Sequence, residues 1–232
     1  MAKDHPGGGV IPNQVFVGCP WKTVRSKYER AIDRLRKRFP LSFVIVGRGD
    51  SQEAQDLLDV IKERLFSSSQ AVFDAAGGNA NVSLEFGLAE ASEIPRAIYV
   101  SSHAASQSGT DSPIIADLAG KKRNLYTQQK RLQSLLTEAA KAHPYSKRFE
   151  IFLLKEFRRA DKGGKKRARG LALKIVHSLD GVTNRRRADI VQGLQADPGS
   201  YSLDEINDMI GKLHKGGLIR SLQGPYSTVT VR

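Results

Sequence analysis

One segment of the chain carries two carboxylates whose spacing could support chemistry. Asp74 follows the short apolar run 70–73, which predicts a strand, and Gly77 and Gly78 break the strand pattern after it. Glu85 falls in the first turns of the helix that comes next. An ionised carboxylate beside a reacting carbon can stabilise developing positive charge or attack the carbon as a nucleophile. The segment therefore predicts a strand, a turn and a helix that present a reactive carboxylate.

The helix around Glu85 is mostly apolar. Asn79 or Asn81 can begin it as the N-cap residue. Positions three and four residues from Glu85 lie on the same helix face and hold one amide and three apolar side chains: Asn81, Val82, Leu88 and Ala89. Exposed amides at the helix start favour the charged carboxylate and the apolar neighbours oppose it. The sequence leaves open which effect is larger.

Short apolar runs alternate with helical patterns over residues 14–145. The runs that predict buried strands are 15–18, 41–46, 70–73 and 97–100. Helices are expected between them, one carrying Tyr28, Ile32 and Leu35 and another spanning 54–66. This alternation predicts an open α/β fold of the flavodoxin or Rossmann type, in which a parallel sheet is covered by helices on both faces.

The carboxyl ends of such strands form the usual ligand site. The candidate substrate-binding residues there are Gly18, Cys19, Trp21, Gly77, Gly78, Asn79 and Asn81. Cys19 reads better as a small buried residue than as a nucleophile, because no basic residue flanks it in sequence. Trp21 and Tyr28 can stack on a base or serve as core or rim residues. Residues 101–112 form a polar loop that can act as a flap over the site or as a simple connection.

The rest of the chain predicts a second domain. We expect a flexible arm at 1–13, a helical and basic linker at 146–166 and a small domain at 167–232. The small domain shows helices over 171–179 and 188–194, a capping box at Ser202–Glu205 that opens a third helix, and a hairpin of 218–222 with 227–231. This order resembles a winged helix-turn-helix domain over roughly residues 165–232.

Positive charge is concentrated in the last third of the chain. Residues 1–146 hold 19 Lys and Arg against 15 Asp and Glu, whereas residues 147–232 hold 18 against 9. The basic residues most suited to contacting a phosphate backbone are Lys165, Lys166, Arg167, Arg169, Arg185, Arg186 and Arg187. Nucleic-acid binding, a protein-binding winged helix and a merely solvated surface all fit this charge.

The amino-acid composition argues against a membrane protein, a disulfide-stabilised protein and a metalloprotein. The apolar runs are too short to cross a bilayer and the N-terminus shows no signal-peptide pattern, so we expect a cytoplasmic protein without a membrane partner. The single cysteine excludes an internal disulfide. The five histidines show no metal-ligand spacing, so the sequence predicts no metal and no bound cofactor. A homo-oligomer remains open.

Residues 14–140 resemble the nucleoside 2-deoxyribosyltransferase-like superfamily, which adjoins the bacterial Toll/interleukin-1-receptor-like (TIR-like) NAD hydrolases. The resemblance is carried by the segments VFVGCPW, FDAAGGNANVSLEFGLAEASEIPRAIYV and SPIIADLAGKKRNLY. The family pattern Asn-Val-x-x-Glu-x-Gly-x-Ala falls on residues 81–89. The resemblance implies that Glu85 attacks C1′ of an N-ribosyl bond and that Asp74 helps hold the sugar. Residues 78–81, Gly-Asn-Ala-Asn, replace an Asp-Ser-Gly-Thr-like segment of the transferases, which argues against transfer between bases.

The leaving group separates the candidate substrates. Nicotinamide leaves NAD as a neutral molecule, whereas a purine or pyrimidine base benefits from a general acid, for which Asp74 and, less well, His103 are the candidates. The sequence thus predicts an N-glycosidase, either an NAD glycohydrolase or a nucleoside hydrolase, with a winged-helix tail for DNA or protein binding. The alternative is a transcriptional regulator that binds DNA and senses a nucleotide without turnover.

Overall fold

The computed structural model describes residues 9–47, 57–75, 79–101, 123–181, 184–196, 201–221 and 228–232. The chain divides into two compact units. The first comprises residues 1–35 and 43–139, and the second comprises residues 36–42 and 140–232.

A five-stranded sheet forms the first unit. Its strands are β1 (Ile11–Gly18), β2 (Ser42–Val44), β3 (Ser68–Asp74), β4 (Arg96–Ser101) and β5 (Arg123–Tyr126), in the spatial order β2-β1-β3-β4-β5. β1 pairs with β3, β3 with β4, and β4 with β5, all in parallel. The predicted α/β fold with a parallel sheet is confirmed.

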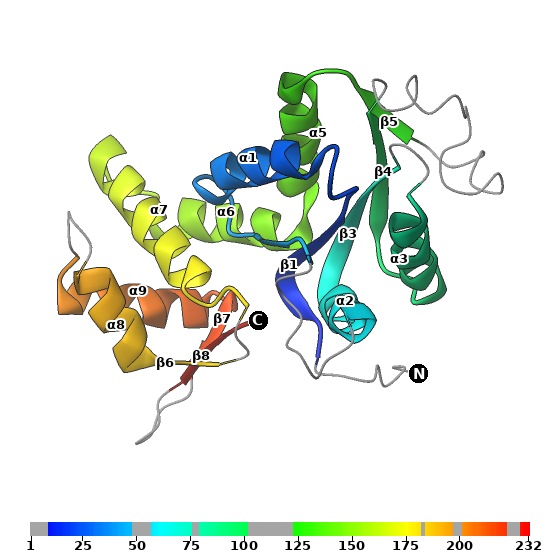
Figure 1. Cartoon of the computed structure of the whole chain (residues 1–232). Coiled ribbons are helices and arrows are strands. Elements are labelled where there is room, and N and C mark those ends of the chain that lie inside the picture. Colours follow the sequence, from blue (N-terminus) through cyan, green and yellow to red (C-terminus); the bar gives the residue numbers. More distant parts are fainter. Residues whose placement is uncertain are drawn as a thin grey trace. The chain divides into compact units, whose positions relative to one another are not determined.

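Helices cover both faces of this sheet (Figure 1). α1 (Arg25–Arg36) and α5 (Gln129–Ala142) lie on one face, and α2 (Leu57–Phe66) and α3 (Ala80–Ala91) on the other. Gln129 and Gln133 of α5 donate side-chain hydrogen bonds to the carbonyls of Lys27 and Ala31, which fixes α5 along α1. The three central strands, β1, β3 and β4, are therefore buried from both sides over most of their length, which explains why they read as continuous apolar runs.

Three phenylalanines join the sheet to α3. The Phe73 ring of β3 lies 6.1 Å from that of Phe16 in β1 and 5.4 Å from that of Phe86 in α3, centroid to centroid. All three side chains are buried. This contact sets the position of α3 on the sheet and hence the position of Glu85, one residue before Phe86.

Replacing Phe73 by alanine is expected to destabilise the first unit by about 3–5 kcal/mol, because it removes the ring between Phe16 and Phe86 and leaves a cavity. Urea unfolding followed by fluorescence of Trp21, the only tryptophan, reports on this unit. Leu84→Ala, at a half-exposed position of α3, is the control and should shift stability by no more than about 0.5 kcal/mol. Equal losses in the two variants would contradict the packing described.

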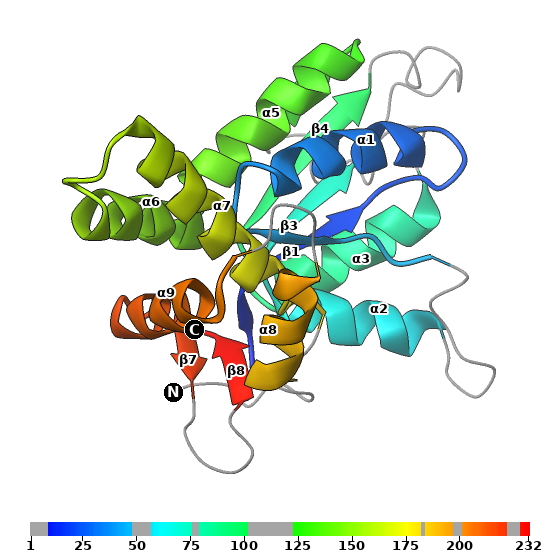
Figure 2. The same cartoon turned by 90° about the vertical axis from the view of Figure 1, so that its left-hand side faces the viewer.

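The second unit is helical with a small antiparallel sheet (Figure 2). Its helices are α6 (Pro144–Glu156), α7 (Lys162–His177), α8 (Arg187–Gln195) and α9 (Leu203–Lys215). Its strands are β6 (Arg185–Arg186), β7 (Ile219–Ser221) and β8 (Thr228–Val231), with β8 between the other two. Ile175, Ile206, Leu213 and Val229 are fully buried and form part of its core.

The predicted start of α9 is confirmed. The Ser202 hydroxyl accepts from the Glu205 amide and the Glu205 carboxylate accepts from the Ser202 amide, which completes the capping box. At the other end Gly217 takes a positive φ of 68°, a conformation that favours glycine, and lets the chain turn into β7. The hairpin of β7 and β8 is also as predicted.

Other boundaries differ from the sequence-based expectation. β5 and β6 were not expected as strands, and β1 begins at Ile11, within the segment expected to be an arm. α7 begins at Lys162 rather than at Leu171, because Asp161 accepts a hydrogen bond from the Gly164 amide as an N-cap and so starts the helix inside the segment expected to be a linker.

Candidate functional site

The close approach of Glu85 to Gly18 defines the candidate site. Gly18 is the last residue of β1 and pairs in register with Phe73 of β3. A Cβ atom at position 18 would lie 2.4 Å from Oε2 of Glu85 and 2.6 Å from the Phe73 ring. Only glycine permits this approach, so the carboxylate of α3 reaches the carboxyl end of β1.

This end of β1 is the topological switch point of the sheet. In the order β2-β1-β3-β4-β5, chain progression reverses direction between β1 and β3. Open α/β sheets bind ligands in the crevice outside the strand ends at such a point. Glu85 therefore lies where the fold is suited to receive a small molecule.

Oε2 of Glu85 is buried without a hydrogen-bond partner among the described residues. Burial raises the pKa of the Glu85 carboxyl from 4.5 to about 7. The sequence left open whether the amides at the helix start or the apolar neighbours have the larger effect on this carboxyl. In the structure, desolvation by the surroundings has the larger effect. A carboxyl with a pKa near 7, and with one oxygen that accepts no hydrogen bond from the described residues, is suited to stabilise a cationic centre that enters the site.

Asp74 is anchored in a buried hydroxyl network. Its Oδ2 accepts hydrogen bonds from the hydroxyl of Tyr28, at 2.9 Å, and from that of Tyr126. Ser101 is a further hydrogen-bond partner of Tyr126. Burial, reinforced by the negative charge of Asp74, raises the pKa of both phenols well above their usual value. Both tyrosines therefore stay protonated at neutral pH and donate hydrogen bonds to Asp74.

The two carboxylates approach the site from opposite faces of the sheet. Phe73 and Asp74 are consecutive in β3, so their side chains point to opposite faces. Phe73 meets Phe86 of α3, and Asp74 meets Tyr28 of α1. Glu85, on α3, comes from the same side as Phe73. The two acids are thus held by different elements rather than by each other.

Cys19 follows β1 within electrostatic reach of both acids. Burial, followed by the negative charge of Asp74, raises the pKa of its thiol to about 12, and Glu85 adds to the same effect. The thiol is therefore neutral at physiological pH and is not a thiolate nucleophile.

Trp21 packs at the end of β2 rather than in the core. Its ring is 51% exposed, lies against the backbone of Gly47 and carries the guanidinium of Arg25 3.6 Å from the ring centroid. A base could stack only on the surface that Arg25 leaves open. Tyr28, by contrast, is fully buried and is not available for stacking.

Asn79 is the residue that caps α3. Its side chain accepts hydrogen bonds from the amides of Asn81 and Val82, at 3.0 and 3.2 Å. Asn81 itself is exposed. Gly77, Gly78 and His103 lie outside the described residues, as does nearly all of the expected flap.

Most of the basic residues expected to contact nucleic acid are engaged within the second unit. Arg167 forms two hydrogen bonds with Glu205, and Arg169 forms two with Glu150. Arg185 donates to the carbonyl of Ser178, and Arg187 to the side chain of Asn207. Arg167 is the main cause that lowers the pKa of Glu205 to about 2.

Three of these basic residues are exposed, and their side chains form no hydrogen bond or ion pair with the part of the chain that the structure describes: Lys165, Lys166 and Arg186. Arg185 and Arg186 form strand β6, and Arg187 is the first residue of α8. The charge available to an outside anion is therefore smaller than the sequence count indicates.

Sequence reasoning missed the partners of Asp74. Tyr126 was not recognised because β5 is only four residues long, and Ser101 was assigned to the polar loop that follows β4. Both lie at the ends of their strands and pair in register. The signal that could have found Tyr126 is an aromatic hydroxyl at the end of a short run, at the same sheet edge as a strand-terminal aspartate.

Comparison with known proteins gives no family model that matches the chain and no significant match to a curated protein sequence. Within the described part of the chain, no group of three or more His, Cys, Asp or Glu side chains could hold a metal ion. None of the described helices is long and apolar enough to cross a membrane.

Replacing Glu85 by glutamine is expected to stabilise the protein at pH 8 by about 1–3 kcal/mol, since it removes an ionised buried carboxylate. The folded-state pKa of Glu85, about 7, exceeds the ordinary glutamate value of 4.5, so wild-type stability falls as pH rises between these values. The difference should therefore shrink towards zero below pH 4.5. Chemical denaturation at pH 4.5 and pH 8 measures it. A variant no more stable than wild type at pH 8 would contradict the assigned burial.

Proposed function

We propose that the first unit cleaves an N-glycosidic bond of a nucleotide or nucleoside and that Glu85 is the reacting carboxylate. The proposal is carried by one observation: Oε2 of Glu85, beside Gly18 at the switch point of the sheet, is buried and has no hydrogen-bond partner among the described residues. The resemblance of residues 14–140 to the deoxyribosyltransferase-like and TIR-like superfamily supports the same assignment.

The chemistry requires one ionised carboxylate near the anomeric carbon. As the bond to the base breaks, positive charge develops on C1′, and Glu85 stabilises the charge or traps the carbon as an ester. Water then completes hydrolysis at the same carbon. Because the pKa of Glu85 is about 7, a substantial fraction of the protein carries the required charge at neutral pH.

Asp74 is better suited to positioning than to proton donation. Its Oδ2 already accepts from Tyr28 and Tyr126, so the network fixes the carboxylate as an acceptor at the end of β3. We therefore assign Asp74 to holding the sugar side of the site. A site without a dedicated acid favours a leaving group that departs neutral, which places dinucleotides of the NAD type ahead of nucleosides.

Incubation of the full chain with NAD and, separately, with purine and pyrimidine nucleosides tests the proposal. Chromatography should detect release of nicotinamide or of the free base by wild type, and Glu85→Gln should lower the rate by at least about 10²-fold, because the neutral amide cannot offset the charge at C1′. Glu63→Gln, at an exposed position of α2, is the matched control and should keep the wild-type rate.

The outcome that contradicts the proposal is equally plain. If NAD and the nucleosides remain intact with the wild-type protein, both with and without added duplex DNA, the proposed N-glycosidase activity is excluded. Binding without turnover would then favour the alternative function, nucleotide sensing by a DNA-binding regulator.

For the second unit we propose a winged helix-turn-helix domain. Support comes from three consecutive helices, α7, α8 and α9, which are followed by the hairpin β7–β8. The short strand β6, which lies between α7 and α8 in the chain, pairs with β8 and extends the hairpin to a three-stranded sheet. The acidic side chains of α9 are partly neutralised, since Glu205 pairs with Arg167 and Asp208 with Lys212. These pairs reduce the repulsion that α9 would otherwise exert on a phosphate backbone.

If this unit binds DNA, the exposed residues Lys165, Lys166 and Arg186 should provide phosphate contacts. Their joint replacement by alanine is expected to weaken binding of duplex DNA of any sequence and to reduce the slope of log K against log salt by about 2–3. Fluorescence anisotropy over a salt series measures both. The charge-matched control replaces Lys130, Lys155 and Arg158, which are also exposed. Equal effects of the two triple variants would contradict the assignment.

A further inference from the structure

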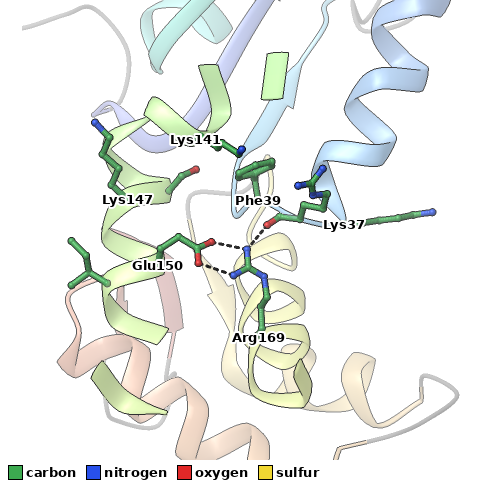
Figure 3. Close-up of a pocket in the computed structure, with 9 residues that line it drawn as sticks. Lys37, Phe39, Lys141, Lys147, Glu150 and Arg169 are labelled. Carbon is green, nitrogen blue, oxygen red and sulfur yellow. Dashed lines mark hydrogen bonds and ion pairs between the residues drawn. The ribbon is translucent and has the colours of Figure 1, made fainter. Parts of the chain in front are cut away.

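A pocket of about 700 Å³ lies within the second unit (Figure 3). Its walls come from residues 37–39, from Lys141 at the end of α5, from α6 and from Arg169 of α7. Small-molecule sites in proteins span roughly 300–1,000 Å³, so the pocket has the size of a site for a nucleotide-sized ligand. It consists of residues other than those of the Glu85 site.

The charges around this pocket are unbalanced. Lys37, Arg38, Lys141 and Lys147 line it, and no ion pair engages any of these four side chains among the described residues. The lysines are exposed, and Figure 3 shows Lys37 and Lys147 extending outward on flexible stems. Such stems can turn onto a bound anion.

The one acidic side chain in the lining is already neutralised. Glu150 accepts two hydrogen bonds from Arg169, at 2.8 and 2.6 Å, and Arg169 also donates to the carbonyl of Arg38 at 2.7 Å (Figure 3). This pair fixes the wall formed by α6, α7 and residues 37–39. It leaves the four other cations without a counter-charge among the residues that the structure describes.

The pocket also offers apolar surface and an unused hydroxyl. Phe39 and Ile151 line it, and Ile151 is 64% exposed although it is a large apolar residue. Ser146 is 1% exposed, and its Oγ is buried without a hydrogen-bond partner among the described residues. Buried hydroxyls normally have a partner, so this one is consistent with a site that a polar ligand completes.

We propose that this pocket binds an organic polyphosphate, with a nucleoside triphosphate as the representative chemistry. A triphosphate chain carries about four negative charges at neutral pH, which balances Lys37, Arg38, Lys141 and Lys147. The organic part of the ligand lies against Phe39 and Ile151. Binding removes the repulsion among four like charges and stabilises the unit.

The shape of the surface favours a small ligand over a nucleic-acid backbone. A duplex places phosphates on a convex surface and is contacted by flat or protruding basic faces. Here the cations surround a hollow with apolar side chains in its lining. Duplex DNA is accordingly the competing ligand that the experiment must exclude.

Isothermal titration of the full chain with ATP, with inorganic tripolyphosphate and with a short DNA duplex tests the proposal. ATP is expected to bind more tightly than tripolyphosphate, because only ATP can use Phe39 and Ile151. Joint replacement of Lys37, Lys141 and Lys147 by alanine should weaken ATP binding at least about tenfold. Lys155→Ala, at an exposed position of α6 outside the lining, is the control and should leave the affinity unchanged.

A second control separates this site from the proposed active site. Gly18→Val blocks the approach of Glu85 in the first unit and should leave ATP binding to the pocket unchanged. Three results would overturn the proposal: no binding of ATP at 1 mM, tripolyphosphate binding as tight as ATP, or loss of DNA binding without loss of ATP binding in the triple-lysine variant.

Discussion

The close approach of Glu85 Oε2 to Gly18 determines the character of the site in the first unit. A glycine at the end of β1 lets a carboxylate enter space that the side chain of any other residue would fill. Within the described parts of the chain, Oε2 is then buried without a hydrogen-bond donor. Burying a carboxylate in this way costs stability, which the raised pKa of Glu85 expresses. Such a cost is typical of functional sites, where local strain and unsatisfied groups serve binding or chemistry.

The surrounding structure holds this arrangement from two sides. Phe73 and Phe86 fix α3 against the sheet, so the position of Glu85 follows from aromatic packing in the core. On the opposite face, Tyr28 and Tyr126 fix Asp74 through their hydroxyls. The site therefore combines one free acid with one anchored acid, and this difference underlies the roles proposed for them.

Much of this could be predicted from the sequence, and the reasons for the failures are physical. Continuous apolar runs predicted the strands that end at Gly18 and Asp74, and the motif at 81–89 directed attention to Glu85 as a candidate, whose role stays a prediction. Tyr126 could not be found, because four-residue strands carry little periodicity. Nor could the pairing of Arg167 with Glu205 or of Arg169 with Glu150, since contacts between distant residues leave no local pattern. A count of charges in the sequence therefore does not show which basic side chains are paired within the protein.

The protonation state of Glu85 can be measured as a function of pH. Carbon-13 NMR of side-chain carboxyls, with Glu85→Gln used to identify the signal, follows the titration of this one group. The account predicts an apparent pKa near 7 and a change in that signal when NAD or a nucleoside is added. A Glu85 carboxyl that titrates near 4.5 and does not respond to these ligands would contradict it.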